Sequence, residues 1–162
     1  MAAISTPLTL ALFEPDIAQN AGAMLRTCAC LGARAAIVEP AGFPVSDRHF
    51  RRAGMDYLGH VAIDRHVSWA AFADWKRAGG RRLVLLTTRG GTDLWDFMFR
   101  AGDIIMVGRE SAGVPEAVHE AADAEIRIAI APPLRSLNVS VAAALALGEA
   151  TRQLRRGTSE LA

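Results

Sequence analysis

Three segments of the chain gather residue types that bind ligands through the backbone and through a few polar side chains. They read EPDIAQNAG at residues 14–22, GRESAGVP at residues 108–115 and APPLRSLNVS at residues 131–140. Their glycines permit close approach of the backbone to a ligand, and their Glu, Ser and Asn side chains supply hydrogen-bonding groups. Arg26 lies just after the first segment and supplies a planar guanidinium that suits an anionic group. The chemistry favoured by these residue types is ligand binding in loops, with a cation nearby.

Each segment also has a purely structural interpretation. Gly108 can serve only as a turn residue, and Pro115 only as the first residue of a helix. Ser136 and Asn138 can serve only as caps of the last helix. For each segment alone the structural interpretation is favoured, whereas three such segments that all follow predicted strands together favour a functional site.

Standard catalytic and nucleotide-binding motifs are absent from the sequence. Residues 108–113 lack the spacing of G-x-G-x-x-G, and no G-x-x-x-x-G-K-[ST] occurs. The chain has no Ser nucleophile elbow and no His-Glu zinc motif, and the scattered histidines at 49, 60, 66 and 119 do not favour a triad. Cys28 and Cys30 point to different faces of a helix, so no disulfide is expected. No further ligand at metal spacing accompanies them, so no metal is expected.

Alternating strands and helices are expected to position the three segments. The apolar runs predict strands at residues 8–13, 35–38, 61–63, 83–87, 104–107 and 126–130. Predicted helices cover residues 21–31 with Asn20 as cap, 69–78 with Ser68 as cap, 115–120, and 139–154 opened by Asn138. A short helix after Ser46 or Asp47 is also expected. This order predicts one α/β domain with a mostly parallel sheet and helices on both faces. Ligands of such sheets bind at the carboxyl ends of the strands.

The composition excludes several classes of protein. The chain has 162 residues, of which 51% are hydrophobic and 22% charged, with a net charge of +1 and a mean hydropathy of +0.20. These values fit one globular domain and exclude a disordered chain. The uncharged stretch at residues 136–148 is shorter than the roughly 20 apolar residues of a membrane span. Since no signal peptide is found and disulfides are not expected, we predict a cytoplasmic protein that does not contact a membrane.

The charge pattern gives a weaker indication. Lys76 is the only lysine, so the other seventeen basic residues are arginines, a preference typical of GC-rich genomes. Arg48, His49, Arg51 and Arg52 form one basic cluster. The cluster is either a solvated helix face or a phosphate-binding surface, and both interpretations stay open.

In order and spacing, the three segments resemble the three motifs of the SPOUT methyltransferases. The first motif is NAGAMLRT at residues 20–27, the second is GRESAGVP at 108–115, and the third runs from IRI at 126–128 to SLNVS at 136–140. Further matches are FEP at 13–15, EPAGF at 39–43, RRAGMDY at 51–57 and LTT at 86–88. These matches resemble the subfamily of small tRNA (cytidine(34)-2′-O)-methyltransferases. The resemblance covers residues 8–154.

The resemblance implies a fold, a cofactor and a substrate. It implies a SPOUT fold with a C-terminal trefoil knot, one domain over residues 1–162 with its core at 8–154 and a frayed tail, and assembly into a homodimer. It implies S-adenosylmethionine as cofactor, S-adenosylhomocysteine as product, and no metal. The implied reaction is 2′-O-methylation of the wobble nucleotide, cytidine 34 or modified uridine 34, in leucine tRNAs. The alternatives are another tRNA position, ribosomal RNA, or an RNA-binding module without catalysis.

The resemblance also assigns site residues by position. The cofactor pocket is expected to contain Leu86, Thr87, Gly108, Glu110, Gly113, Ile128, Ser136, Leu137 and Asn138. The catalytic group is expected to contain Arg26, Asn20, Glu110 and Ser140. The arginine at this motif position is often described as a general base, but a guanidinium has no acceptor and stays protonated. We therefore expect Arg26 to grip the adjacent phosphate and to stabilise the developing alkoxide, while a substrate phosphate or a water takes the proton.

The remaining residues of this group are expected to position substrate or loop. Asn20 and Ser140 are expected to position the substrate, and Glu110 to order its loop or the substrate. The alternative role of Glu110 is that of a carboxylate favoured by a helix start. The sequence departs from the family pattern at Ala23, Ala112 and Gly148, which affects the expected tRNA contacts more than the cofactor motif. A dimer interface formed partly by the helices at 21–31 and 139–154 would account for the slightly apolar composition.

Overall fold

A seven-stranded sheet forms the centre of the structure, in the order β3-β2-β1-β6-β4-β7-β5. The computed structural model describes residues 7–45, 48 and 55–159. The strands are β1 (Thr9–Phe13), β2 (Arg34–Val38), β3 (Ile63–His66), β4 (Leu83–Leu86), β5 (Thr92–Asp93), β6 (Ile104–Val107) and β7 (Ala124–Arg127). Every pair of neighbouring strands is parallel. The predicted α/β class with a mostly parallel sheet is confirmed.

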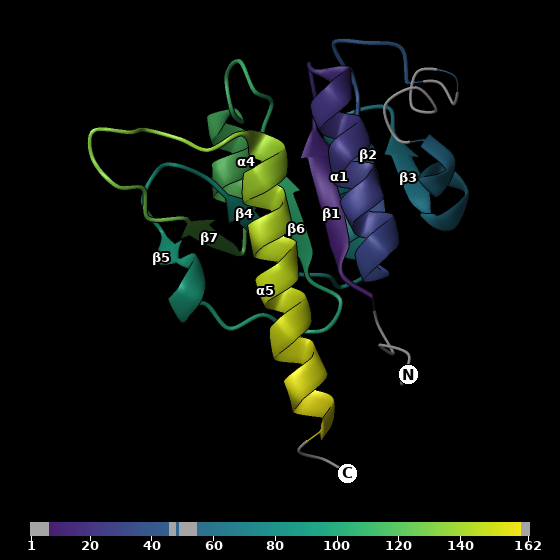
Figure 1. Cartoon of the computed structure of the whole chain (residues 1–162). Helices are drawn as coiled ribbons and strands as arrows, with labels where there is room; N and C mark the ends of the chain where they lie inside the picture. Colours follow the sequence, from purple (N-terminus) through teal and green to yellow (C-terminus); the bar gives the residue numbers. More distant parts are fainter. Residues whose placement is uncertain (1–6, 46–47, 49–54, 160–162) are drawn as a thin grey trace.

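Helices cover both faces of this sheet. They are α1 (Ala18–Leu31), α3 (Trp69–Ala78), α4 (Glu116–Ala121) and α5 (Val139–Ser159), with 3-10 turns η1 (Met55–His60) and η2 (Leu94–Asp96). Helices α1 and α5 lie side by side on one face (Figure 1). Because side chains of a strand alternate between faces, Leu10 and Leu12 of β1 pack with α1 and α5, while Ala11 and Phe13 pack with α3 and α4. Two hydrophobic cores result, one on each face.

Local signals placed several boundaries correctly. Helix α1 ends at Gly32, whose φ of 69° is the left-handed conformation expected after a helix. The Ser68 side chain accepts a hydrogen bond from the Ala71 amide and caps α3 as predicted. Pro115 is the N-cap of α4 and not its first residue, a shift of one position.

The prediction that Asn20 caps α1 is wrong. The helix begins at Ala18, and its N-cap Ile17 makes no side-chain capping bond. Asn20 lies inside the first turn, and its amide nitrogen donates to Glu110 instead. The predicted helix is therefore three residues too short at its start, because Asn20 is a residue type that often caps helices and was interpreted as the cap of this one.

Three strands differ from their prediction by more than one residue. Strand β3 starts at Ile63, where the sequence predicts an end, because its residues pair with β2 from Ala35 to Val38. Strand β7 ends at Arg127, and the expected continuation to residue 130 leaves the sheet. The two-residue β5 was not predicted, because its sequence, Thr92–Asp93, contains no hydrophobic run. Its position depends on Gly91, where a Cβ would lie 2.4 Å from the Glu125 carbonyl oxygen.

The last helix and the basic cluster differ in how far the structure tests them. Helix α5 continues to Ser159, five residues past its predicted end. Arg48 is helical and exposed, whereas Ser46, Asp47, His49, Arg51 and Arg52 lie outside the described residues. The trefoil knot stays a prediction. In the described part of the chain, no helix combines the length and apolarity that crossing a bilayer requires.

Candidate active site

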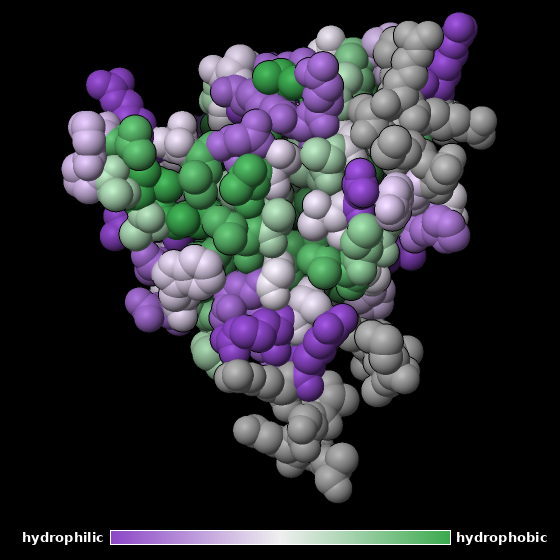
Figure 2. Space-filling model, viewed as in Figure 1, coloured by the Kyte–Doolittle hydropathy of each residue, from purple (hydrophilic) through white to green (hydrophobic). Residues whose placement is uncertain are grey.

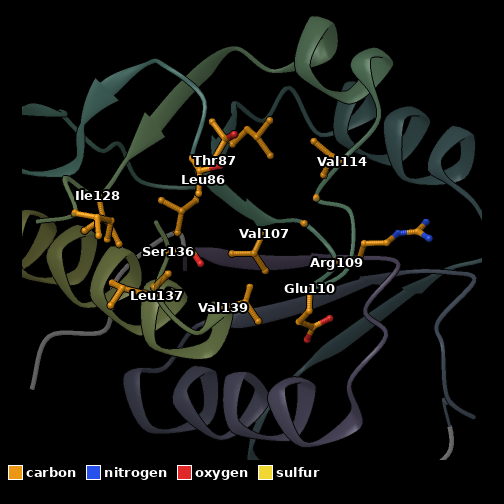
Figure 3. A pocket seen from close by; sticks show the side chains of 16 residues that line it. Leu86, Thr87, Val107, Arg109, Glu110, Val114, Ile128, Ser136, Leu137 and Val139 are labelled. Carbon is orange, nitrogen blue, oxygen red and sulfur yellow. The ribbon is translucent and has the colours of Figure 1, made fainter. Parts of the chain in front are cut away.

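The carboxyl ends of β4, β6 and β7 surround a pocket of about 340 Å³ together with the first turn of α5. Figure 3 shows side chains from these elements around one common space. Most of its apolar surface comes from aliphatic side chains, and its polar surface comes from two Thr, one Ser and the loop after β6. The lining residues are Leu85, Leu86, Thr87, Thr88, Val107, Gly108, Arg109, Glu110, Gly113, Val114, Ile128, Ile130, Ser136, Leu137, Val139 and Ala142.

The structure brings almost all predicted cofactor residues to this pocket. Leu86, Thr87, Gly108, Glu110, Gly113, Ile128, Ser136 and Leu137 line it, whereas Asn138 does not. The lining residues that the sequence interpretation missed are sequence neighbours of the predicted ones, such as Thr88 and Ile130. Their positions at the ends of predicted strands could have identified them, because ligands of parallel sheets bind there.

A closed loop of residues 109–113 forms one wall of the pocket. The Arg109 amide donates to the Gly113 carbonyl at 3.2 Å, and the Gly113 amide donates to the Arg109 carbonyl at 2.9 Å. Gly113 has a φ of +64°, which favours glycine. A Cβ on Gly108 would lie 2.7 Å from both Cα and C of Gly113. The two glycines therefore let two stretches of backbone pack against each other beside the pocket.

Glu110 connects this loop to the segment after β1. Its Oε1 accepts from the Asn20 side-chain amide at 3.0 Å, and its Oε2 accepts from the Asp16 backbone amide at 3.2 Å. In return, the Glu110 amide donates to Asp16 Oδ1 at 3.1 Å, and the Ser111 hydroxyl donates to Asp16 Oδ2. Figure 3 shows the Glu110 carboxylate pointing toward α1. Glu110 thus orders its own loop, and Asp16 is a partner that the sequence interpretation did not single out.

The third segment joins the same network. The Asn138 side-chain amide donates to Asn20 Oδ1 at 3.1 Å, and Asn138 Oδ1 accepts from the Ser140 amide at 2.8 Å. The Ser140 hydroxyl also donates to Asn138 Oδ1. Asn138 therefore caps α5 as predicted and contacts Asn20 as well. We call the residues Asp16, Asn20, Glu110, Ser111 and Asn138 the loop network, since they join all three segments.

The loop network makes a prediction about pH. Hydrogen bonds with Glu110 and Ser111 lower the pKa of Asp16 from 3.8 to about 2. A carboxyl group with a lowered pKa in the folded state stabilises that state above its unfolded pKa, and this stabilisation is lost as pH falls through the folded value. Asp16→Asn is expected to be less stable than the wild type by a constant amount above about pH 5, with the difference shrinking between about pH 4 and 2.

Urea unfolding of both proteins across this pH range measures the difference. Asp74→Asn is a matched control, since Asp74 is exposed on α3 and pairs with the neighbouring Arg77 of the same helix. A stability difference for Asp16→Asn that stayed constant down to pH 2 would show that the ionised carboxylate contributes nothing to the network.

Arg109 lines the pocket, but its guanidinium contacts residues outside the pocket. Its side chain points away from the common space (Figure 3) and forms an ion pair with Glu14. Its guanidinium also lies 5.9 Å from the centre of the Phe13 ring. Glu14 has a φ of 41°, a strained value for a residue other than glycine, at the point where the chain leaves β1. This pair ties the ends of β1 and β6 together next to the loop network.

Arg26 lies apart from the pocket lining. It is exposed on α1, its Nη2 donates to the Tyr57 hydroxyl at 3.5 Å, and its guanidinium stacks 4.5 Å from the centre of the Tyr57 ring. Ser140 likewise does not line the pocket. The structure therefore joins Asn20, Glu110 and Ser140 through the loop network, while Arg26 contacts Tyr57.

In the described ranges, no group of three or more His, Cys, Asp or Glu residues is placed to hold a metal ion. Both cysteines are free, and burial raises the pKa of the Cys28 thiol to about 12.

Comparison with known proteins agrees with the motif order. Residues 7–148 match the SpoU rRNA methylase family. The chain belongs to this family. The resemblance to SPOUT methyltransferases that the three motifs predicted is therefore confirmed. Since the match spans all three segments, the pocket and the loop network both belong to the methylase fold of this family.

Individual relatives are similar over most of their length. A tRNA (cytidine(34)-2′-O)-methyltransferase of Beijerinckia indica is 66% identical over 90% of this chain and 91% of its own. A solved structure described as giving insights into the 2-OH methylation of C/U34 on tRNA superposes with a TM-score of 0.87 at 40% identity, over 93% of this chain and 98% of its own. The SpoU methyltransferase AviRb of Streptomyces viridochromogenes, in complex with the cofactor AdoMet, gives a TM-score of 0.83 at 29% identity, over 91% and 58%.

Proposed function

We propose that this SpoU methylase transfers a methyl group from S-adenosylmethionine to the ribose 2′-oxygen of the wobble nucleotide, cytidine or modified uridine 34, of tRNA. The observation that carries the proposal is the pocket built by residues 85–88, 107–114 and 128–142, with the loop network beside it joining residues 16–20 to the last two of these segments. The named relatives act on this nucleotide, and the identity extends over nine tenths of the chain. We extend the proposal to leucine tRNAs, to a cytoplasmic location and to one domain with a knotted C-terminal segment on the basis of the sequence resemblance.

The residues of the pocket fit S-adenosylmethionine. Leu86, Ile128 and Leu137 offer aliphatic surface to an adenine ring, and the volume lies within the range of ligand pockets, about 300–1,000 Å³. The close approach of Gly108 and Gly113 leaves backbone polar groups at the wall where a larger residue would fill the space. Thr87 and Ser136 add hydroxyl groups. When bound, the cofactor supplies an electrophilic methyl group on a positively charged sulfur.

The chain's own residues then hold and orient the substrate. Glu110 keeps the loop after β6 in place through Asn20 and Asp16, and Asn138 does the same for the segment before α5. Asn20 links Glu110 to Asn138 within this network and Ser140 contacts Asn138, and we assign both residues a positioning role for the ribose. Holding the 2′-oxygen in line with the transferred methyl group raises the rate of transfer, because the reacting atoms are already oriented when the substrate binds.

We assign Arg26 the role of stabilising the negative charge that develops on the 2′-oxygen during transfer. Its guanidinium can donate to a phosphate next to the ribose and to the 2′-oxygen as the proton leaves, but it offers no acceptor for that proton. A phosphate oxygen or a water is left as the proton acceptor. Because Arg26 does not line the pocket of its own chain, we propose that it acts in a homodimer, in which α1 of one protomer faces the site of its partner.

The surface of α5 supports this dimer. Val141 is 48% exposed and Leu145 is 38% exposed, one helical turn apart on α5, and Leu137, just before the helix, is 40% exposed. Figure 2 shows hydrophobic surface gathered over the amino-terminal half of this helix. A stripe of exposed aliphatic side chains on a helix that already packs against α1 suits an interface with a second copy.

Disruption of this stripe is expected to give monomers. The variant Val141→Asp places a charge in the proposed interface, so its mass by light scattering should be that of one chain while the wild type gives two. Val67→Asp is the matched control, because Val67 is 78% exposed in the loop before α3 and should leave the mass of the assembly unchanged. A dimeric Val141→Asp protein would refute this interface, and a monomeric wild type would refute the dimer itself.

A strain lacking the protein tests the proposed substrate. Mass spectrometry of its tRNA nucleosides is expected to show loss of 2′-O-methylation at position 34, restored by the wild-type gene. Loss of a methyl group from ribosomal RNA, or from another tRNA position, would instead favour the wider family activity. Unchanged methylation of every RNA in the strain would contradict the proposal.

A further inference from the structure

A second cavity of about 310 Å³ adjoins the pocket and shares Thr88, Ile128 and Ile130 with it. Its remaining walls come from the end of β7 and from the loop that leads to α5, with the side chains of Arg127, Ala129, Leu134 and Arg135. The lining is mostly polar and contains no acidic residue. Two arginines therefore line a cavity directly beside the proposed methyl-transfer site.

These two arginines differ from seven others in the structure. Ion pairs with Asp or Glu engage Arg34, Arg65, Arg77, Arg82, Arg89, Arg109 and Arg152. Over residues 7–45, 48 and 55–159, no carboxylate forms an ion pair with Arg127 or Arg135. Asp93 is the register neighbour of Arg127, but its carboxylate accepts from the Trp95 amide at 3.1 Å. Both arginines are exposed.

The chemistry of this pair suits phosphate. A guanidinium is planar, presents several donors in a fork and matches two oxygens of a phosphate at once. A single cofactor carboxylate needs one such fork, whereas two forks on neighbouring segments suit a chain of phosphodiesters. Because the protein has a net charge of only +1, its affinity for a polyanion has to come from local groups of this kind.

We propose that Arg127 and Arg135 form a subsite that binds a phosphodiester of the RNA substrate next to the methylated ribose. The proposal rests on the RNA substrate proposed above and adds a place where its backbone is held. The subsite shares part of the pocket wall, so RNA bound there passes close to the transferred methyl group. Phosphate contacts position a nucleic acid without reading its bases, so this subsite sets orientation and affinity.

The double variant Arg127→Gln/Arg135→Gln tests the subsite. Filter binding of unmodified tRNA over a series of salt concentrations is expected to show a Kd raised about tenfold or more. The slope of log Kd against log salt is expected to fall by about 1 to 2, as for the loss of one or two phosphate contacts. Calorimetry is expected to give an unchanged Kd for S-adenosylmethionine, which also verifies the fold. The double variant Arg127→Lys/Arg135→Lys should keep much of the wild-type salt slope.

The test also has a matched control and three outcomes that would contradict the subsite. Arg77→Gln removes an exposed arginine on α3 and should leave tRNA affinity and salt slope as in the wild type. A double variant with wild-type tRNA affinity and slope would overturn the subsite while the proposed function stands. A double variant that lost cofactor affinity but kept tRNA affinity would also overturn it. A wild-type protein that bound no tRNA at all would overturn the proposed function and the subsite together.

Discussion

Arg26→Ala is expected to lower kcat for methyl transfer about 100- to 1,000-fold, the range observed when one donor to a developing oxyanion is removed. The affinity for S-adenosylmethionine is expected to stay at the wild-type value, because Arg26 does not line the pocket. Single-turnover transfer of a labelled methyl group to tRNA measures the rate, and calorimetry measures the affinity. A large fall in rate at constant cofactor affinity would place Arg26 at the reacting oxygen.

Two further variants separate this role from a structural one. Arg26→Lys keeps the charge but not the planar fork, so it should recover part of the lost rate. Tyr57→Phe removes the hydroxyl that accepts from Arg26 and keeps the ring on which the guanidinium stacks, so it should change the rate little. If Arg26→Ala stayed near full activity, or lost cofactor affinity and rate in parallel, the assigned role would be wrong.

Gly108→Ala is expected to weaken binding of S-adenosylmethionine about 10- to 100-fold. The added Cβ would lie 2.7 Å from two backbone atoms of Gly113, so the closed loop of residues 109–113 has to shift. Such overpacking costs about 1–3 kcal/mol, and each 1.4 kcal/mol corresponds to about tenfold in affinity. Calorimetric titration with the cofactor measures the effect.

Another glycine provides the control for this substitution. Gly148 lies inside α5, where a Cβ would meet nothing within 4 Å, so Gly148→Ala should leave cofactor binding unchanged. It should also stabilise the protein by about 0.5–1 kcal/mol, the usual gain of alanine over glycine in a helix. Equal cofactor affinity in Gly108→Ala and wild type would show that the loop does not need the close glycine contact.

The sequence predicted those features that depend on local signals. Gly32 ends α1 and Ser68 begins α3 because both act within one turn of their own helix. The parallel sheet was predictable because the buried strands β1, β4 and β6 are continuous apolar runs. Residues at the ends of these strands then had to meet at one edge, and most of the predicted cofactor residues do line one pocket.

Features set by long-range contacts were not predictable in this way. Asn20 has a capping side chain, but its partner Glu110 is 90 residues away, and this contact decides its role. Asp16 gave no signal of its own, since its importance comes from Glu110 and Ser111 across the loop. The short strand β5 depends on space next to Glu125 and not on an apolar run. Family resemblance supplied the cofactor and substrate, which composition and net charge did not indicate.

Methylation of unmodified tRNA by the purified protein tests the central claim most directly. The protein is incubated with tRNA and with S-adenosylmethionine whose methyl group carries carbon-13, and the nuclease fragments are analysed by mass spectrometry. The account predicts one labelled methyl group, on the ribose of nucleotide 34. Label on a base, label confined to another nucleotide, or no label in the presence of bound cofactor would contradict it.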